Sequence, residues 1–231
     1  MKNLILFFVL IVSFFSCAKM SSKNNSKEFY INGIIEEIRD STKVYLKVQK
    51  SNKILPLDTA YTINNVFKFN GKIDKPEVVG IYIDSLKGEI GLFIQNDSVF
   101  IEVNKNNLSD SKIYGSELNN EYLKFVKQSN KILSKTNYLF PLFQKARTEN
   151  DVDKLKNINN QIEQIHKDNI AFTLSYARNN PESYISAFAL KSLLKSEYVT
   201  KDTIASIYQN FTHEVKKGDF AIEVLLFLEE K

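Results

Sequence analysis

The chain has 231 residues, of which 43% are hydrophobic, and it carries 31 Lys and Arg against 27 Asp and Glu. This composition is typical of a globular protein. The weak positive charge is well mixed along the chain, which argues against nucleic-acid binding, because that needs a clustered basic face. With only 7 glycines and no G-x-G-x-x-G or G-x-x-x-x-G-K pattern, the sequence contains no phosphate-binding loop motif.

Residues 1–16 have the pattern of a secretory leader. Lys2 supplies a positive charge, and residues 4–15 are apolar apart from Ser13. This run is shorter than the roughly 20 residues of a transmembrane helix, but it has the length of a signal-peptide core. The only cysteine, Cys17, follows directly, and residues 17–27 then form a polar tether.

Cys17 and the residues before it resemble the lipobox of bacterial lipoproteins, although Phe14 stands where leucine is commonest. The resemblance implies cleavage before Cys17, attachment of diacylglycerol to its thiol, and acylation of the new amine with a chain such as palmitate. Each buried CH₂ would contribute about 0.8 kcal/mol to membrane attachment. No acidic residue follows Cys17 directly, and by resemblance to known lipoprotein sorting rules this implies an outer-membrane lipoprotein that faces the periplasm. The alternatives are a plain secretory signal with an incidental cysteine, or an uncleaved anchor.

Residues 28–114 are predicted to form an antiparallel β domain. Val44, Leu46 and Val48 illustrate the alternation of apolar residues that is typical of half-buried strands. We expect strands at residues 29–35, 43–48, 65–73, 78–83, 91–95 and 98–103. Turn residues separate these runs at roughly 10-residue spacing, which favours a sandwich or a barrel.

Residues 115–231 change to a helical period, so the predicted fold class is α+β. Ser116 and Asp151 are candidate N-caps of two long helices, and Pro141 should end or kink the first. The first helix carries a largely apolar stripe with steps of three and four residues, and the second carries a largely apolar seam that repeats every seven residues. These two patterns predict that the helices form an antiparallel hairpin. The stripe is Leu118, Tyr122, Phe125, Ser129, Ile132 and Thr136, and the seam is Leu155, Ile158, Ile162, Ile165, Asn169, Phe172 and Tyr176.

Three shorter helices should follow the hairpin. Asn180-Pro181 is predicted to start the first, with proline at the first helical position. That helix would extend to Leu194, and two more are expected at about residues 201–211 and 219–228.

Four stretches resemble a family of Gram-negative envelope lipoproteins. They are residues 29–35 (FYINGII), residues 58–60 (DTA) before 67–71 (FKFNG), residues 115–122 (GSELNNEY) and residues 180–188 (NPESYISAF). In that family a β-rich domain of unknown function is followed by a helical spacer and a thioredoxin-like domain with a Cys-x-x-Cys pair. This chain stops at Lys231, about where that last domain would begin. The resemblance therefore implies architecture and location, and it assigns the thiol–disulfide activity to no residue here.

Histidine and cysteine chemistry finds little support in the sequence. Glu163 and His166 have the Glu-x-x-His spacing of carboxylate-bridged di-iron sites, which need a second such pair. The other histidine, His213, has no acidic residue three positions before it. No G-x-S-x-G elbow is present, and with Cys17 acylated no thiol would remain. We expect no catalytic residue, no metal and no cofactor.

Two further patterns are open to more than one interpretation. Tyr45, Tyr61 and Tyr82 could flank a sheet face used for binding, or they could pack in the core. Asp followed by Ser or Thr resembles an O-glycosylation signal of some envelope proteins, but such pairs are also ordinary turn residues. These pairs are Asp40-Ser41, Asp58-Thr59, Asp84-Ser85, Asp97-Ser98 and Asp202-Thr203.

The favoured function is a membrane-anchored periplasmic lipoprotein that acts as a non-enzymatic binding or scaffold module. The expected partners are the membrane, through Cys17, and a protein of the envelope. The alternative is an accessory or truncated relative of a thioredoxin-like lipoprotein, with a redox protein as partner. An enzyme of another kind is the third hypothesis.

Overall fold

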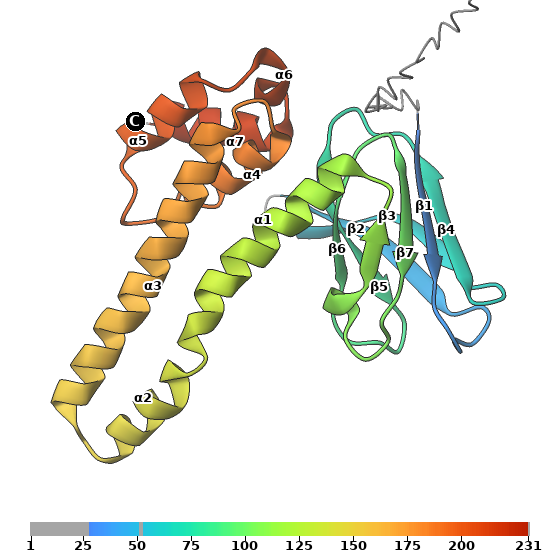
Figure 1. The fold of residues 1–231 in the computed structure, drawn as a ribbon. Helices are drawn as coiled ribbons and strands as arrows, with labels where there is room; N and C mark the ends of the chain where they lie inside the picture. The colour runs from blue at the N-terminus through green and yellow to red at the C-terminus, as the bar shows by residue number, and fades with distance from the viewer. Residues whose placement is uncertain (1–27, 51–52, 231) are drawn as a thin grey trace, which may run out of the picture.

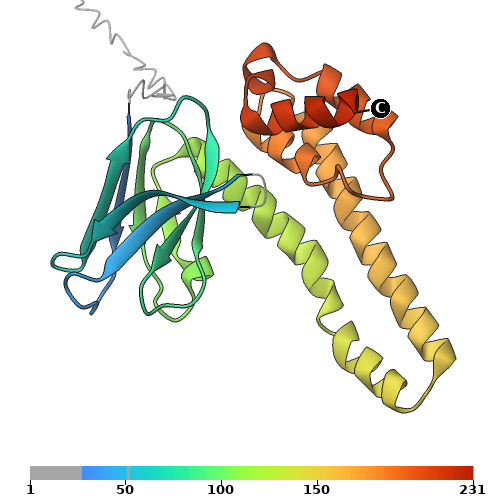
Figure 2. The same cartoon turned by 180° about the vertical axis from the view of Figure 1, so that it is seen from behind.

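A computed structural model describes residues 28–50 and 53–230. The predicted leader, the tether and Cys17 lie outside these residues. Figures 1 and 2 show a β part on one side of the molecule and a helical part on the other, connected by the long helix α1. None of the helices in the described part combines the length and the apolar character needed to cross a membrane.

The β part is a sandwich of two four-stranded sheets, with strand orders β4-β1-β7-β8 and β3-β2-β5-β6. The strands are β1 Phe29–Ile34, β2 Lys43–Lys50, β3 Lys53–Tyr61, β4 Val66–Gly71, β5 Glu77–Ile83, β6 Ile90–Ile94, β7 Ser98–Glu102 and β8 Lys112–Tyr114. The sheets do not close into a barrel. One strand pair departs from the antiparallel pattern, because β1 and β7 run parallel.

The core of the sandwich is built by the alternation that the sequence predicts. Val44, Leu46 and Val48 are buried, whereas the residues between them face outward. Opposite them, Ile31 and Phe69 are also buried. The two inner faces therefore enclose one hydrophobic cluster, as in other sandwiches.

The sequence analysis missed strands β3 and β8. β3 is an edge strand in which every residue except Ala60 is exposed, so no alternation of burial marks it. It also contains Pro56, which is tolerated at sheet edges, and its register with β2 shifts at Leu46 and Lys47. β8 is only three residues long.

The helical part begins with the predicted hairpin. α1 Glu117–Leu133 and α2 Leu139–Thr148 form one arm, with a 3-10 turn Ser134–Thr136 between them, and α3 Val152–Asn179 forms the other. A further 3-10 turn, Leu108–Asp110, precedes β8, and the remaining helices are α4 Tyr184–Lys191, α5 Lys201–Gln209, α6 His213–Lys216 and α7 Asp219–Glu229. The α+β fold class is thus confirmed.

The break in the first arm does not occur at Pro141. α1 already ends at Leu133, and Pro141 lies in the first turn of α2, where a missing N–H leaves no helical hydrogen bond unmade. The seam on α3 packs against this arm as expected, with Ile158 and Ile165 buried. Asn169, the polar residue of this seam, pairs with a residue of the other arm.

That polar pair joins two residues of the predicted stripe and seam. The Ser129 hydroxyl of α1 donates a hydrogen bond of 2.8 Å to Oδ1 of Asn169 on α3. A polar pair in a largely apolar seam favours one register of two helices, because a slip would leave both groups unpaired. Ser129 and Asn169 therefore align the arms of the hairpin.

The prediction that Asn180-Pro181 starts a helix is wrong. Asn180 instead ends α3, where its Nδ2 donates a 2.8 Å hydrogen bond to the carbonyl of Tyr176. α4 begins three residues after Pro181, with Ser183 as the N-cap that accepts a hydrogen bond from the amide of Ile185. A serine side chain can accept that bond, whereas proline provides only a suitable φ angle.

Candidate functional site

The two parts of the molecule are joined by one aromatic residue of the sheet. Phe93 lies on β6, yet it packs with the hydrophobic cluster of the helices and is fully buried. Its ring makes edge-to-face contacts with Tyr122, Phe188 and Phe220, with centroid distances of 5.7, 6.2 and 5.8 Å. Phe93 therefore connects α1, α4 and α7 to the sheet.

Hydrogen bonds at the start of α1 reinforce this connection. The Ser116 side chain accepts from the amide of Asn119, and Oδ1 of Asn119 accepts from the amide of Phe93 at 3.0 Å. Close by, Nε2 of Gln95 donates a hydrogen bond of 3.1 Å to Oδ2 of the buried Asp97. Burial raises the pKa of Asp97 in spite of the hydrogen bond from Gln95. The first turn of α1 is thus fixed to the β part.

A groove lies between these parts, where the adjoining ends of β2 and β5 face α4 and α7. We call it the interdomain groove. Its sheet wall includes Gln49 and Val78, and its helical wall includes Phe188, Phe220 and Glu223. The main compartment has a volume of about 730 Å³, and a smaller one of about 220 Å³ adjoins it beside Lys50 and Asp219. Volumes of this order suit a small ligand or one segment of a chain.

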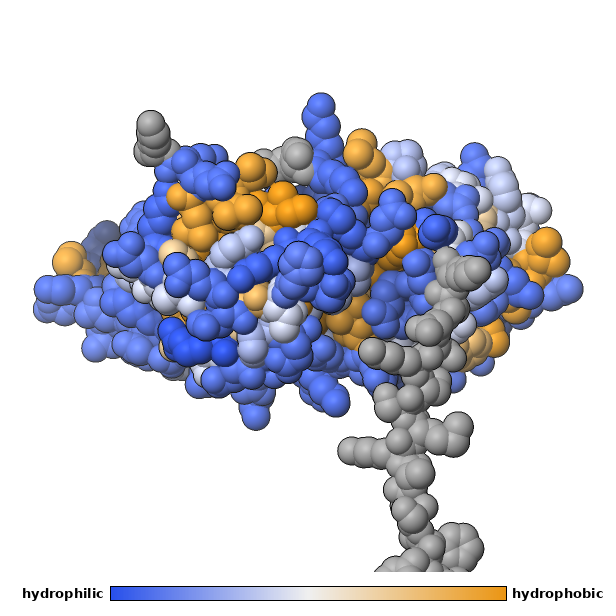
Figure 3. Space-filling view, turned by 90° about the horizontal axis from the view of Figure 1, so that it is seen from above, coloured by the Kyte–Doolittle hydropathy of each residue, from blue (hydrophilic) through white to orange (hydrophobic). Residues whose placement is uncertain are grey.

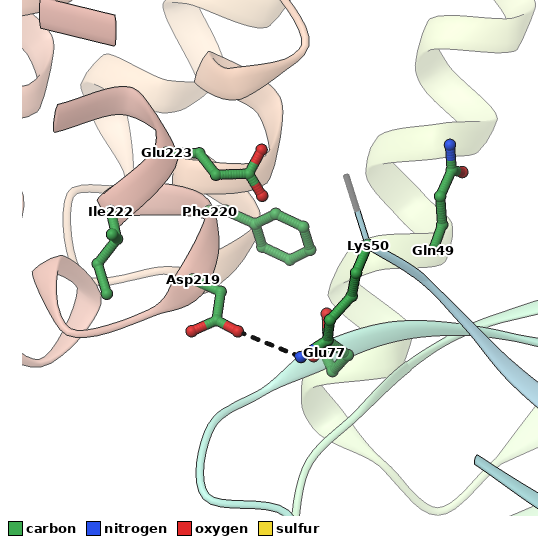
Figure 4. Close-up of a pocket in the computed structure, with 7 residues that line it drawn as sticks. All are labelled: Gln49, Lys50, Glu77, Asp219, Phe220, Ile222 and Glu223. Carbon is green, nitrogen blue, oxygen red and sulfur yellow. Dashed lines mark ion pairs between the residues drawn. The ribbon is translucent and has the colours of Figure 1, made fainter. Parts of the chain in front are cut away.

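Ion pairs connect the walls of the groove. Lys50 of β2 lies 3.0 Å from Glu77 of β5 and 3.5 Å from Asp219 at the start of α7. Figure 4 shows this cross-groove pair between Lys50 and Asp219, with Phe220 pointing toward β2. Lys75 also reaches Asp219, at 3.0 Å. Asp219 therefore bridges two lysines of the β part.

The charges in the groove stabilise one another. The hydrogen bond from Lys50 to Glu77 raises the pKa of Lys50, despite an opposing effect of burial. Burial disfavours the charged form of Asp219, but the hydrogen bonds and charges of Lys75 and Lys50 together lower its pKa. Both groups are therefore ionised at neutral pH.

The helical wall offers an apolar surface with a cation above it. Nζ of Lys191 lies 4.9 Å from the centroid of the Phe220 ring and 2.8 Å from Oε1 of Glu223. Phe188 packs on Phe220 in an edge-to-face contact. Aromatic rings beside paired charges form an amphipathic wall, which suits a ligand with both apolar and polar groups.

The three tyrosines of the sequence analysis share the outer face of one sheet, and none of them packs in the core of the sandwich. Tyr45 of β2 is directly opposite Tyr82 of β5, and Tyr61 of β3 is opposite Lys43. Nζ of Lys47 lies 5.0 Å from the Tyr45 ring centroid and 4.5 Å from that of Tyr82. Lys47 thus already contacts two of the rings. Use of this face for binding stays a prediction.

Apolar residues also reach the surface of the helical part. Figure 3 shows them gathered over the helices on the left and over the β part on the right, among polar residues. On α7, Phe220, Ala221 and Val224 are buried, whereas the side chains on the opposite face are exposed. These exposed residues are Leu225 and Leu226, whereas Ile222, which is also exposed, lines the smaller compartment of the groove.

Other residues considered from the sequence do not form a site together. His166 lies exposed on α3 and His213 begins α6. Within residues 28–50 and 53–230, no group of three or more His, Cys, Asp or Glu side chains could hold a metal ion. Cys17 lies outside the described residues, so its acylation stays a prediction.

Of the Asp-Ser and Asp-Thr pairs, Asp40-Ser41 and Asp84-Ser85 lie in turns, whereas Asp58-Thr59 lies inside β3 and Asp202-Thr203 in the first turn of α5. The side chain of Asp40 accepts from the amide of Asn64, and Asp58 accepts from the amide of Thr59. Ser85 has a positive φ of 70°, as expected in a tight turn. Glycosylation of these pairs stays a prediction.

The groove residues escaped the sequence analysis. Lys50, Glu77 and Asp219 lie far apart along the chain, and each resembles an ordinary surface charge. Lys75 lies beside Pro76, between two predicted strands, and nothing in the sequence around it indicated the ion pair with Asp219 of α7. One signal was available, because Phe93 is a large aromatic residue at an outward position of its strand.

The comparisons with known proteins concern the first of these two parts. No significant match to a curated protein was found. Residues 29–122 match the family model described as "Domain of unknown function (DUF4369)". The matched segment contains β1 to β8 and also the first turn of α1, which Ser116 and Asn119 fix to the sheet. From β1 to the start of α1, the chain is therefore similar to this domain of unknown function.

Proposed function

We propose that the protein is a membrane-anchored periplasmic lipoprotein, attached to the outer membrane through Cys17, and that it acts as a non-enzymatic binding module. The interdomain groove is the proposed binding site. The observation that carries this proposal is the groove itself, whose walls come from different parts of the chain and combine aromatic rings with paired charges.

The state of the charges supports binding over catalysis. A general acid, base or nucleophile needs a pKa near the working pH or an adjacent activating group. In the groove, Asp219 and Lys50 instead have pKa values shifted away from neutrality. Fixed charges of this kind can orient a ligand, and the rings of Phe188 and Phe220 can contact its apolar part.

The anchor is tested on the native protein by mass spectrometry of its N-terminal peptide. The proposal predicts that the peptide begins at Cys17 and carries a diacylglycerol and an acyl chain. In a Cys17→Ser variant, labelling with radioactive palmitate and cleavage should both stop. Normal processing and membrane retention of that variant would contradict the anchor.

The groove is tested by filling it. Gln49 is exposed, lines both compartments and lies on β2. A Gln49→Trp variant should block the groove, whereas Lys43→Trp places the same side chain on the same strand and face, away from the groove. In pull-downs from envelope membranes, the native chain and Lys43→Trp should recover a partner that Gln49→Trp loses. Equal recovery by all three would show that binding does not use the groove.

The second candidate function is an accessory of a thioredoxin-like thiol–disulfide system, which the sequence resemblance suggests. The apolar residues Leu225 and Leu226 on the outer face of α7 favour it, because a helix that is apolar on both faces usually has a partner on each. A thioredoxin-like reading frame directly downstream would support this candidate. Leu226→Lys should then abolish recovery of the redox protein but leave groove-dependent binding intact.

A further inference from the structure

Positive charge is concentrated in one arm of the helical hairpin. Residues 122–148, which we call the basic arm, include α1 from Tyr122 onward, the 3-10 turn and α2. They contain six Lys and Arg and no Asp or Glu. The rest of the chain therefore contains the other 25 Lys and Arg and all 27 Asp and Glu. The expectation of an evenly mixed charge is therefore wrong for this arm.

Within the part of the chain that the structure describes, the cations of the basic arm make no ion pairs, with one exception. Lys145 lies 3.9 Å from Glu149, at the end of the arm. No carboxylate among the described residues lies within 4.0 Å of the other five, all of which are exposed. These five are Lys124, Lys127, Lys131, Lys135 and Arg147. By contrast, on α3 Asp151 pairs with Lys154 at 2.7 Å and Glu163 with Lys167 at 2.6 Å.

Four of these lysines form a stripe. Lys124, Lys127 and Lys131 follow one another at intervals of three and four residues, which places them on one side of α1, and Lys135 follows four residues later in the 3-10 turn. Phe125, which is buried, points to the opposite side, where α1 packs on α3. The lysine stripe therefore faces solvent along α1 and the 3-10 turn.

Large apolar side chains are exposed beside this stripe. At the start of α2, Tyr138, Phe140 and Leu142 have exposed fractions of 58%, 64% and 49%. Leu139, between them, is buried against α3. Phe140 lies on one side of α2, whereas Tyr138 and Leu142 lie on the other, where the Tyr138 hydroxyl contacts Gln161 of α3. Exposed apolar residues next to unpaired cations are the composition of segments that lie in the interface of an anionic bilayer.

We propose that the basic arm docks on the surface of a membrane that contains anionic lipids. Lysines of the stripe contact the headgroups, while Phe140 and its neighbours enter the interface. Anionic lipid fits better than nucleic acid or an acidic peptide, because neither of those requires an aliphatic residue such as Leu142 at the tip of the arm. The proposal goes beyond the groove-binding function and does not depend on acylation of Cys17.

The position of the arm adds to the argument. Figures 1 and 2 show α2 at one end of the molecule and the beginning of β1 at the other. The arm therefore contacts a membrane at a point remote from the residue where the chain enters the β part. Such a contact would fix the orientation of the molecule, and with it the direction in which the interdomain groove opens.

The chain contains no tryptophan, so a single one can report on the arm. We would introduce it as Phe140→Trp in the full-length protein and add vesicles of phosphatidylcholine with or without phosphatidylglycerol. Brominated lipids should quench this tryptophan, and its emission should shift to the blue, only when phosphatidylglycerol is present. Tyr61→Trp, on β3, provides the matched reporter, whose emission should stay unquenched.

A second comparison separates the stripe from net charge. In the Phe140→Trp background, replacing all four stripe lysines by glutamine should reduce quenching of the tryptophan at least tenfold, since each lysine near an anionic surface contributes roughly fivefold to partitioning. The control replaces four exposed lysines of the β part by glutamine and should leave quenching unchanged. Those lysines are Lys43, Lys53, Lys68 and Lys72.

Three results would overturn the proposal. The first is quenching that is equal with and without phosphatidylglycerol, because that would come from the leader or from apolar insertion alone. The second is an equal loss of quenching in the stripe variant and in the control variant. The third is the same blue shift with soluble polyglutamate, which would assign the arm to acidic peptides.

Discussion

Phe93→Ala is the substitution that tests the junction between the two parts. The ring is fully buried, lies on β6, and contacts Tyr122, Phe188 and Phe220 of the helical part. Removing it takes away the aromatic connection that these three rings share. We therefore expect a loss of stability together with a loss of coupling between the sheet and the helices.

The size of the effect follows from the burial of Phe93. Truncation of a fully buried phenylalanine to alanine costs about 4 kcal/mol, which includes the cavity that remains. The three centroid distances of 5.7, 6.2 and 5.8 Å lie in the favourable range for edge-to-face pairs, each worth about 1 kcal/mol beyond burial. These pairs share one ring and overlap with burial, so we expect about 4 to 5 kcal/mol in total.

The assay is urea unfolding followed by circular dichroism, together with small-angle X-ray scattering of the native state. Phe69→Ala is the control, because Phe69 is equally buried but lies inside the sandwich. Both variants should lose similar stability, but only Phe93→Ala should increase the radius of gyration and separate the helix transition from that of the sheet. A cost below about 1 kcal/mol for Phe93→Ala, or an unchanged single transition, would refute the reasoning.

Three further substitutions test smaller features. Asp219→Asn should cost less than about 1 kcal/mol at neutral pH, since the ion pairs with Lys50 and Lys75 are partly exposed. The pKa of Asp219 is lowered from 3.8, so the native chain should keep this contribution to stability until the pH falls through the lowered pKa. The Asp219→Asn variant should show no such pH-dependent loss. Ser116→Ala should lower the free energy of unfolding by about 1 kcal/mol, because α1 loses its N-cap. A clearly smaller decrease in the free energy of unfolding, with the helix content of α1 unchanged, would count against that role. Gly115→Ala should cost on the order of 2 kcal/mol in urea unfolding, because φ is +98° and the new Cβ would lie 2.5 Å from the Ser98 carbonyl oxygen; an unaffected midpoint would contradict this.

The parts of the fold that could be predicted are those that local periodicity determines. Alternation at Val44, Leu46 and Val48 located β2, and the seam through Ile158 and Ile165 located α3. Strand β3 could not be found in this way, because its side chains are exposed on both faces and Pro56 interrupts it. An edge strand is defined by its hydrogen bonds to a neighbour, which leave no pattern in its own sequence.

The groove could not be predicted for a different reason. Its ion pair between Lys50 and Asp219 joins residues that are close only after the helices have packed on Phe93. The sequence analysis left open whether Tyr45 and Tyr82 flank a sheet face or pack in the core, and the strand register places them opposite each other on the outer face. Long-range contacts between a sheet and helices follow from side-chain packing, which one sequence does not specify.

The most direct test of the groove as a binding site is site-specific photo-crosslinking in the envelope. A photoreactive phenylalanine derivative would replace Lys195, an exposed residue of the groove, or Lys156, an exposed residue of α3, as the matched control. We predict a discrete crosslinked product from position 195 that disappears when Gln49→Trp is added, and none from position 156. No product at position 195, or the same product from both positions, would contradict the claim that the interdomain groove binds the partner.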